Sequence, residues 1–176
     1  STGKGNIGIY APNSVAVNTG TGKIMVGATD DRDSAGNLYS DFSKVVYGIG
    51  MAADNGGSIK NDGEIRLYGN KSIGMYGSGN GTVVENNGKI LLDGSRATDT
   101  NKIQGMTGVY VDNGAKFVNR GTIQTTDSYA GRDGKVNPNV SGLTGVAVMN
   151  GSTLINEASG KILIDADNSY GVIIRG

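Results

Sequence analysis

The acidic trio Asp30, Asp31 and Asp33 is the densest group of possible cation ligands in the chain. Asp-x-Asp spacing can bind a cation, but neither a Gly nor a bidentate Glu follows at EF-hand spacing. The Gly-rich run 77–82 also lacks the Asp that calcium-binding nonapeptide repeats require. We interpret the trio as a solvated loop, with weak calcium binding as the alternative. We predict no metal site and no cofactor.

Residue types that commonly carry catalysis are scarce. The chain has no His and no Cys to activate or to serve as a nucleophile. The Gly-rich run 77–81 is not followed by the Gly-Lys-Ser/Thr of a phosphate-binding loop. Enzymes that cleave polysaccharides need carboxylates close together, often beside Arg, Lys or a cation.

The repeat described below predicts short strands stacked in successive coils, in which side chains at equivalent positions form columns on the outer surface. No two acidic residues on neighbouring coils fall in the same column. One outward column contains Glu64, Lys89, Thr122 and Lys161, and the next contains Arg66 and Gln124. We therefore predict that the chain is not an enzyme. A β-helical enzyme acting on polysaccharides is the alternative.

Candidate binding residues concentrate in three loop-like segments, 28–46, 95–106 and 127–143. Aromatic and cationic side chains displayed on loops over a rigid scaffold are typical of recognition surfaces. The alternative is passive tolerance, because lengthening a loop costs little free energy. The candidates are Arg32, Tyr39, Phe42, Lys44, Arg96, Lys102, Tyr129, Arg132 and Lys135.

A repeat that runs through the whole chain must position these segments. Its first anchor is a Gly followed by an apolar residue, at Gly8, Gly50, Gly74, Gly108, Gly145 and Gly171. Its second anchor is a Gly two places before an Ile, at Gly22, Gly63, Gly88, Gly121 and Gly160. The spacing from first to second anchor is nearly constant (14, 13, 14, 13 and 15 residues), whereas the return spacing varies from 11 to 28. All three insertions therefore leave from one junction.

This pattern predicts a right-handed parallel β-helix of five to six coils, each with three short strands. Because side chains alternate faces along a strand, like residues should stack in inward columns. The first-strand column is Ile9, Met51, Met75, Val109, Val146 and Val172, and the second-strand column is Ala16, Ile59, Val84, Phe117 and Leu154. The third-strand pairs are Ile24/Val26, Ile65/Leu67, Ile90/Leu92, Ile123/Thr125 and Ile162/Ile164, with Met25, Arg66, Leu91, Gln124 and Leu163 facing outward.

Two polar or aromatic columns accompany the core. The corner before the third strand has one Asn per coil, at Asn18, Asn61, Asn86, Asn119 and Asn156. Asn tolerates a left-handed backbone, and its amide can bond to the Asn above and below, so we predict a structural ladder. The longer corners after Asn18 and Asn156 predict an imperfect ladder at both ends. Tyr76 and Tyr110 should form a stacked surface pair, and Tyr10 shares their position.

Composition fits one continuous segment over residues 1–176. Glycine is abundant, with 31 residues against 2 prolines, and the formal net charge is zero. No charge run indicates nucleic acid, and no apolar run approaches the roughly 18 residues of a membrane span. The chain begins without Met and ends within its repeat, so we expect a fragment of a longer protein.

The repeat resembles the passenger regions of very large fusobacterial type V autotransporters, the RadD-like adhesins. The resemblance lies in the segments GIGIY, GIGMA, SIGMYGSGNGTVVENNGKILLDG and TGVYVDNGAKFVNRGTI. It implies a monomeric stalk or adhesin on the outer membrane, anchored by a C-terminal β-barrel outside this sequence. The implied partner is an unknown surface protein or glycan receptor on other bacteria or host cells, with roles in biofilm and virulence. A purely structural spacer is a further alternative.

Overall fold

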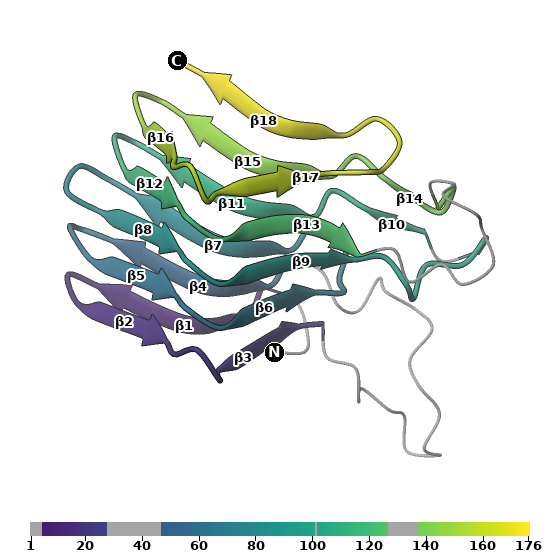
Figure 1. Cartoon of the computed structure of the whole chain (residues 1–176), viewed down its shortest axis with the longest axis horizontal. Helices are drawn as coiled ribbons and strands as arrows, with labels where there is room; N and C mark the ends of the chain where they lie inside the picture. Colours follow the sequence, from purple (N-terminus) through teal and green to yellow (C-terminus); the bar gives the residue numbers. More distant parts are fainter. Residues whose placement is uncertain (1–4, 28–46, 101, 127–136) are drawn as a thin grey trace.

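The computed structural model describes residues 5–27, 47–100, 102–126 and 137–176, and in these ranges it contains eighteen strands and no helix. The strands wind into stacked coils, and every ladder between them is parallel (Figure 1). The predicted parallel β-helix is confirmed. These ranges also contain no helix long and apolar enough to cross a membrane.

Three sheets form the sides of the helix. Sheet 1 contains β1 (Ile7–Pro12), β4 (Ile49–Asp54), β7 (Ile73–Ser78), β11 (Thr107–Asp112), β15 (Thr144–Met149) and β18 (Tyr170–Arg175). Sheet 2 contains β2 (Val15–Asn18), β5 (Ser58–Asn61), β8 (Val83–Asn86), β12 (Lys116–Asn119) and β16 (Thr153–Asn156). Sheet 3 contains β3 (Lys23–Val26), β6 (Glu64–Leu67), β9 (Lys89–Asp93), β13 (Thr122–Thr126) and β17 (Lys161–Leu163).

The strand register confirms the predicted core columns. In sheet 1, Met51 pairs with Met75 and Met75 with Val109, and the equivalent matches hold in sheets 2 and 3. The inward residues of the central coils are fully buried, among them Phe117, except that Thr125 is only partly buried. The outer positions also follow the prediction, except that Leu91 is only 4 % exposed between Arg66 and Gln124 of the adjacent coils.

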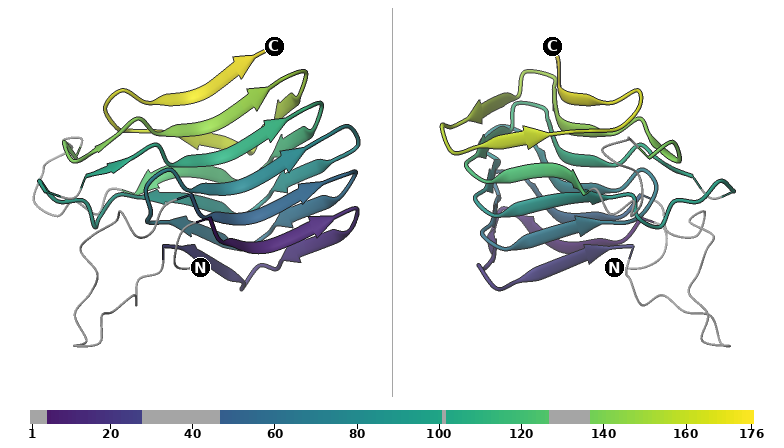
Figure 2. Two further views of the ribbon diagram at one scale, coloured as in Figure 1. Left: turned by 180° about the vertical axis from the view of Figure 1, so that it is seen from behind. Right: turned by 45° about the vertical axis from the view of Figure 1, so that its right-hand side comes forward.

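At the junction where the insertions leave the β-helix, part of the inserted chain is ordered as strands and belongs to the core, although its composition had predicted loops. The parts of the insertions that the structure describes include two short paired strands, β10 (Ile103–Gln104) and β14 (Val140–Ser141). Ile103, Met106, Val140 and Leu143 belong to the buried core cluster, so these segments extend the interior (Figures 1 and 2). The prediction of plain loops there was wrong, because apolar residues in both segments fill the corner.

Glycines at the first anchor allow the strands of sheet 1 to approach the interior closely. A Cβ on Gly74 would lie 2.5 Å from the Gly108 carbonyl oxygen of the next coil and 2.9 Å from Ile90 Cγ2. Gly8, Gly50, Gly108 and Gly145 meet equivalent atoms at 2.5 to 2.9 Å, apart from Ile24 Cγ2, which is 3.5 Å from Gly8. The anchor is therefore a packing requirement of the coil cross-section.

Candidate functional site

Most of the predicted binding residues lie outside the described residues. Arg32, Tyr39, Phe42, Lys44, Tyr129, Arg132 and Lys135 are in this group, as are Asp30, Asp31 and Asp33. Of the two described candidates, Lys102 is exposed, and the Arg96 guanidinium lies 4.9 Å from the centre of the Tyr68 ring. Arg96 therefore packs against a residue of the β-helix. A binding role for the other candidates stays a prediction.

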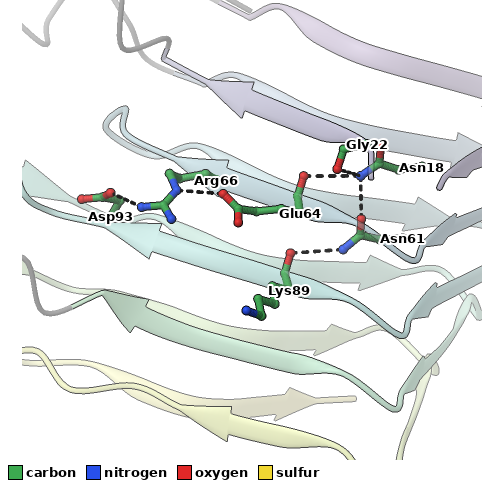
Figure 3. Close-up of polar contacts among 7 residues, drawn as sticks. All are labelled: Asn18, Gly22, Asn61, Glu64, Arg66, Lys89 and Asp93. Carbon is green, nitrogen blue, oxygen red and sulfur yellow. Dashed lines mark hydrogen bonds and ion pairs between the residues drawn. The ribbon is translucent and has the colours of Figure 1, made fainter. Parts of the chain in front are cut away.

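An ionic triad lies on the outer face of sheet 3, around Arg66 (Figure 3). Its Nε donates to Glu64 Oε1 at 3.0 Å on the same strand, and its Nη1 donates to Asp93 Oδ2 at 2.8 Å on the next coil. The Asp93 side chain is only 4 % exposed. Sequence reasoning missed this cluster because Glu64 and Asp93 belong to different columns, and the long Arg66 side chain connects them.

The electrostatics of the triad favour the charged forms of Asp93 and Arg66. Burial alone would raise the pKa of the Asp93 carboxyl, but hydrogen bonds from Ser95 and Arg66 hold that pKa below its ordinary value. Burial would likewise lower the pKa of Arg66, but its bonds to Asp93 and Glu64 raise it overall. The guanidinium therefore stays protonated and cannot take a proton from a substrate.

The lowered pKa of Asp93 predicts a specific dependence of stability on pH. In the unfolded chain an Asp titrates near pH 3.9. Because the folded pKa is lower, ionised Asp93 stabilises the fold above that pH, and this contribution is lost as the pH falls through the folded value. The melting temperature of the Asp93→Asn variant should therefore lie well below wild type near neutral pH, and the gap should narrow below about pH 4.

Thermal denaturation of both proteins between about pH 2.5 and 7 measures this gap. The same substitution at exposed Asp165 on the last coil is the control, and its curve should follow wild type. A gap of constant size across the range would show that the Asp93 carboxylate does not supply this stability.

The five predicted asparagines form a continuous column between sheets 2 and 3. Figure 3 shows its first two members, Asn18 and Asn61. Each Nδ2 donates to the Oδ1 of the next, at 2.8, 2.9, 3.0 and 2.8 Å from Asn18 through Asn156. Asn61, Asn86 and Asn119 are fully buried. These amides satisfy one another inside the corner, where an unpaired polar group would be costly.

Two details of the expected ladder were wrong. The bonds at Asn18 and Asn156 are as short as the inner ones, because the two extra residues form a turn in which Gly22 N donates to Thr19 O. The equivalent turn after Asn156 joins Gly160 N to Glu157 O. In addition, none of the ladder asparagines has a left-handed backbone. Other residues do, at Asn13, Asn55, Asn113, Asn150 and Asn168.

Further polar links join the outer surfaces of successive coils. Arg120 contacts Glu85 Oε1 at 3.4 Å and Glu157 Oε2 at 2.9 Å, so it bridges three coils. On sheet 1 the rings of Tyr76 and Tyr110 stack with centroids 5.8 Å apart, which confirms the predicted pair. These contacts brace the rod, and their members are partnered within it.

Tyr10, on the outer face of sheet 1, is also partnered within the rod. The Tyr10 hydroxyl donates to Asp54 Oδ2 at 2.7 Å on the next coil, a bond that raises the pKa of Tyr10. Among the described residues no group of three or more Asp, Glu, His or Cys is arranged to hold a metal ion. The polar contacts described on this surface therefore link successive coils to one another. They do not form a metal site.

Residues with a left-handed backbone conformation also occupy the corner that leads into sheet 1. These residues lie three places before each anchor glycine, at Gly5, Tyr47, Lys71, Gly105, Gly142 and Asn168. Sequence reasoning missed this column, although its constant offset from the anchor was available as a signal. Tyr47 and Lys71 are the unusual members, because neither Gly nor Asn occupies these two positions.

Comparison with known proteins gives one match. The family model of the BigA third pectate lyase-like domain matches residues 1–122. The searches against curated proteins and against solved structures each give no match. Strand pairing continues beyond the matched part, from β13 to β17 and from β15 to β18.

Proposed function

Because the chain belongs to the family of BigA third pectate lyase-like domains, we propose that it acts as a rigid stalk and contact surface in bacterial attachment. The family relationship supports a passenger-type region of a bacterial surface protein of the adhesin type. The observation that supports the rigid-stalk part of this proposal is the uninterrupted stacking of six strands in sheet 1. At about 4.8 Å per strand this sheet extends about 24 Å along the axis.

The mechanism we propose is passive. Successive coils bond to one another through parallel ladders and the asparagine column, and the ionic bridges of Arg66 and Arg120 join several of them further. Such a rod keeps what it carries at a constant distance and orientation. The described parts of two insertions, which include β10 and β14, lie at one junction (Figure 2), and in this proposal the insertions decorate that side of the rod.

We also propose that the chain is not an enzyme. Among the described residues, Glu64 and Asp93 share Arg66 and so form a carboxylate pair that could be compared with a catalytic dyad. A general acid needs a raised pKa, whereas the pKa of Asp93 is lowered and its oxygens are occupied by Ser95 and Arg66. The triad therefore supports a bracing role.

The partner in this proposal is a surface protein or glycan receptor on other bacteria or on host cells. The chain would act as a monomer on the outside of the cell, within a longer RadD-like autotransporter of the outer membrane. Display on a rod suits this arrangement, since recognition residues commonly lie on loops over a rigid scaffold.

A bead-adhesion assay tests the proposal. Beads coated with the chain should adhere to bacterial or epithelial cells, and a variant with 28–46 and 127–136 replaced by short Gly-Ser linkers should lose most of that adhesion. The second deletion stops before β14 because Val140 and Leu143 belong to the core. A variant with Tyr76 and Tyr110 changed to Ser alters sheet 1 instead and serves as the control.

The results distinguish a contact role of the insertions from a purely structural spacer. Unchanged adhesion after the deletions would remove the contact role of the insertions. No adhesion by the intact chain to any cell tested would favour the spacer alternative and contradict the attachment role of this segment.

A further inference from the structure

Tyr47 and Lys71 occupy backbone positions that disfavour their residue types. Their φ angles are 60° and 52°, in the left-handed region where a side chain crowds its own backbone. The four equivalent corners use Gly5, Gly105, Gly142 and Asn168, residues that tolerate this conformation. Two neighbouring coils therefore accept strain that the other four avoid.

Burial does not offset that strain. Tyr47 is 55 % exposed and Lys71 is exposed as well. The backbone bonds at this corner run from Tyr47 N to Asn70 O and from Lys71 N to Gln104 O, and a glycine would make both equally well. Strained residues that remain exposed point to a role outside folding.

The strained pair presents hydrogen-bond donors together at one corner. Lys71 Nζ lies 3.4 Å from the Tyr47 hydroxyl and 5.5 Å from the centre of its ring. The Lys71 stem lies along Gly105, where a Cβ would come within 3.1 Å of Lys71 Cγ. Asn70 Oδ1 accepts from Gln104 N at 2.7 Å, which orients the amide and leaves its Nδ2 as a further donor. No ion pair to Lys71 exists among the described residues.

We propose that this Tyr47–Lys71 corner binds a saccharide that bears a carboxylate. The ammonium of Lys71 receives the carboxylate, the Tyr47 ring packs against the apolar face of a sugar, and the phenol and the Asn70 amide bond its hydroxyls. An acidic peptide fits less well, because extended peptides bind through free backbone groups, and the N–H groups of Tyr47, Lys71 and Gln104 are already used. The inference rests on the proposed attachment function, for which it supplies a ligand class.

Titration of the whole chain with 3′-sialyllactose, followed by amide NMR shifts, tests this site. We expect shifts concentrated at Tyr47, Asn70 and Lys71 at up to about 10 mM ligand, and weaker binding at high salt. Lactose, which lacks the carboxylate, should cause none of them. Equal binding of a Glu-rich peptide, or no shift at these residues, would overturn the proposal.

Glycine variants separate binding from folding. Lys71→Gly and Tyr47→Gly should each weaken sialyllactose binding at least about tenfold, while relief of strain raises the melting temperature by about 2–4 °C. Gly142→Lys is the matched control, since it places a lysine in the same conformation on another coil and should lower the melting temperature. Variants that melt lower and bind as well as wild type would show that the pair is structural.

The same variants distinguish this site from the general attachment function. If beads carrying Lys71→Gly adhere to cells as well as wild type does and sialyllactose causes no shifts, the saccharide site is wrong and attachment stands. If sialyllactose binds at this corner and the beads adhere to no cell tested, the site stands and the attachment function is wrong.

Discussion

Replacing Gly74 with Ala is expected to destabilise the chain by about 3 kcal/mol, the upper end of the range for overpacking a core. The new methyl group would meet the Gly108 carbonyl oxygen at 2.5 Å and Ile90 Cγ2 at 2.9 Å. The first is backbone of the next coil and the second is a buried core atom, so neither can move without displacing a ladder. The coil would have to separate from its neighbour.

The same substitution at Gly171 provides the matched control. Gly171 occupies the equivalent anchor on the last coil, where the nearest atom to a new Cβ is Ile162 Cγ2 at 4.0 Å. We expect Gly171→Ala to change stability by less than about 0.5 kcal/mol. Urea denaturation of both variants measures the difference. Equal stability of the two would show that the close approach at Gly74 is not a packing requirement.

Replacing Asn86 with Leu, a side chain of similar size, should also cost about 3 kcal/mol, since each buried group left without a partner costs roughly 1–3 kcal/mol. Asn86 lies at the centre of the ladder and is fully buried. Its loss removes the bond received from Asn61 Nδ2 at 2.9 Å and the bond donated to Asn119 Oδ1 at 3.0 Å. Asn61 keeps its second bond, to Lys89 O.

The adjacent Asn87 is the control for the ladder. It is exposed, and its Nδ2 donates to Asp62 Oδ1 on the surface. Asn87→Ala should change the free energy of unfolding by less than about 1 kcal/mol in the same urea experiment. A similar small loss for Asn86→Leu would mean that apolar packing at the corner replaces the amide bonds.

Much of the architecture could be predicted because the repeat is local and regular. Alternation along a strand decides which side chain faces inward, so residues such as Met75 and Val109 could be assigned to a column from their spacing alone. The same reasoning placed Tyr76 beside Tyr110. The position of the insertions followed from one variable interval.

The failures have physical reasons that spacing does not contain. The distance in residues from Asn18 to Ile24 predicted a displaced amide, but a turn closed by Gly22 N and Thr19 O restores its position. Apolar residues in segments of polar composition, such as Ile103 and Leu143, were assigned to loops and lie in the core. Composition averaged over a segment conceals the few residues that anchor it.

The sequence by itself determined the solenoid, its three columns and the corner at which its length varies. The reason is that short strands repeated at a regular interval bury their apolar residues together only when they stack in register. Only the tertiary structure decided which surface residues meet across coils. Arg66 joins carboxylates from different columns, and Lys71 reaches the ring of Tyr47, because long side chains cross the coil spacing in directions that sequence periodicity does not specify.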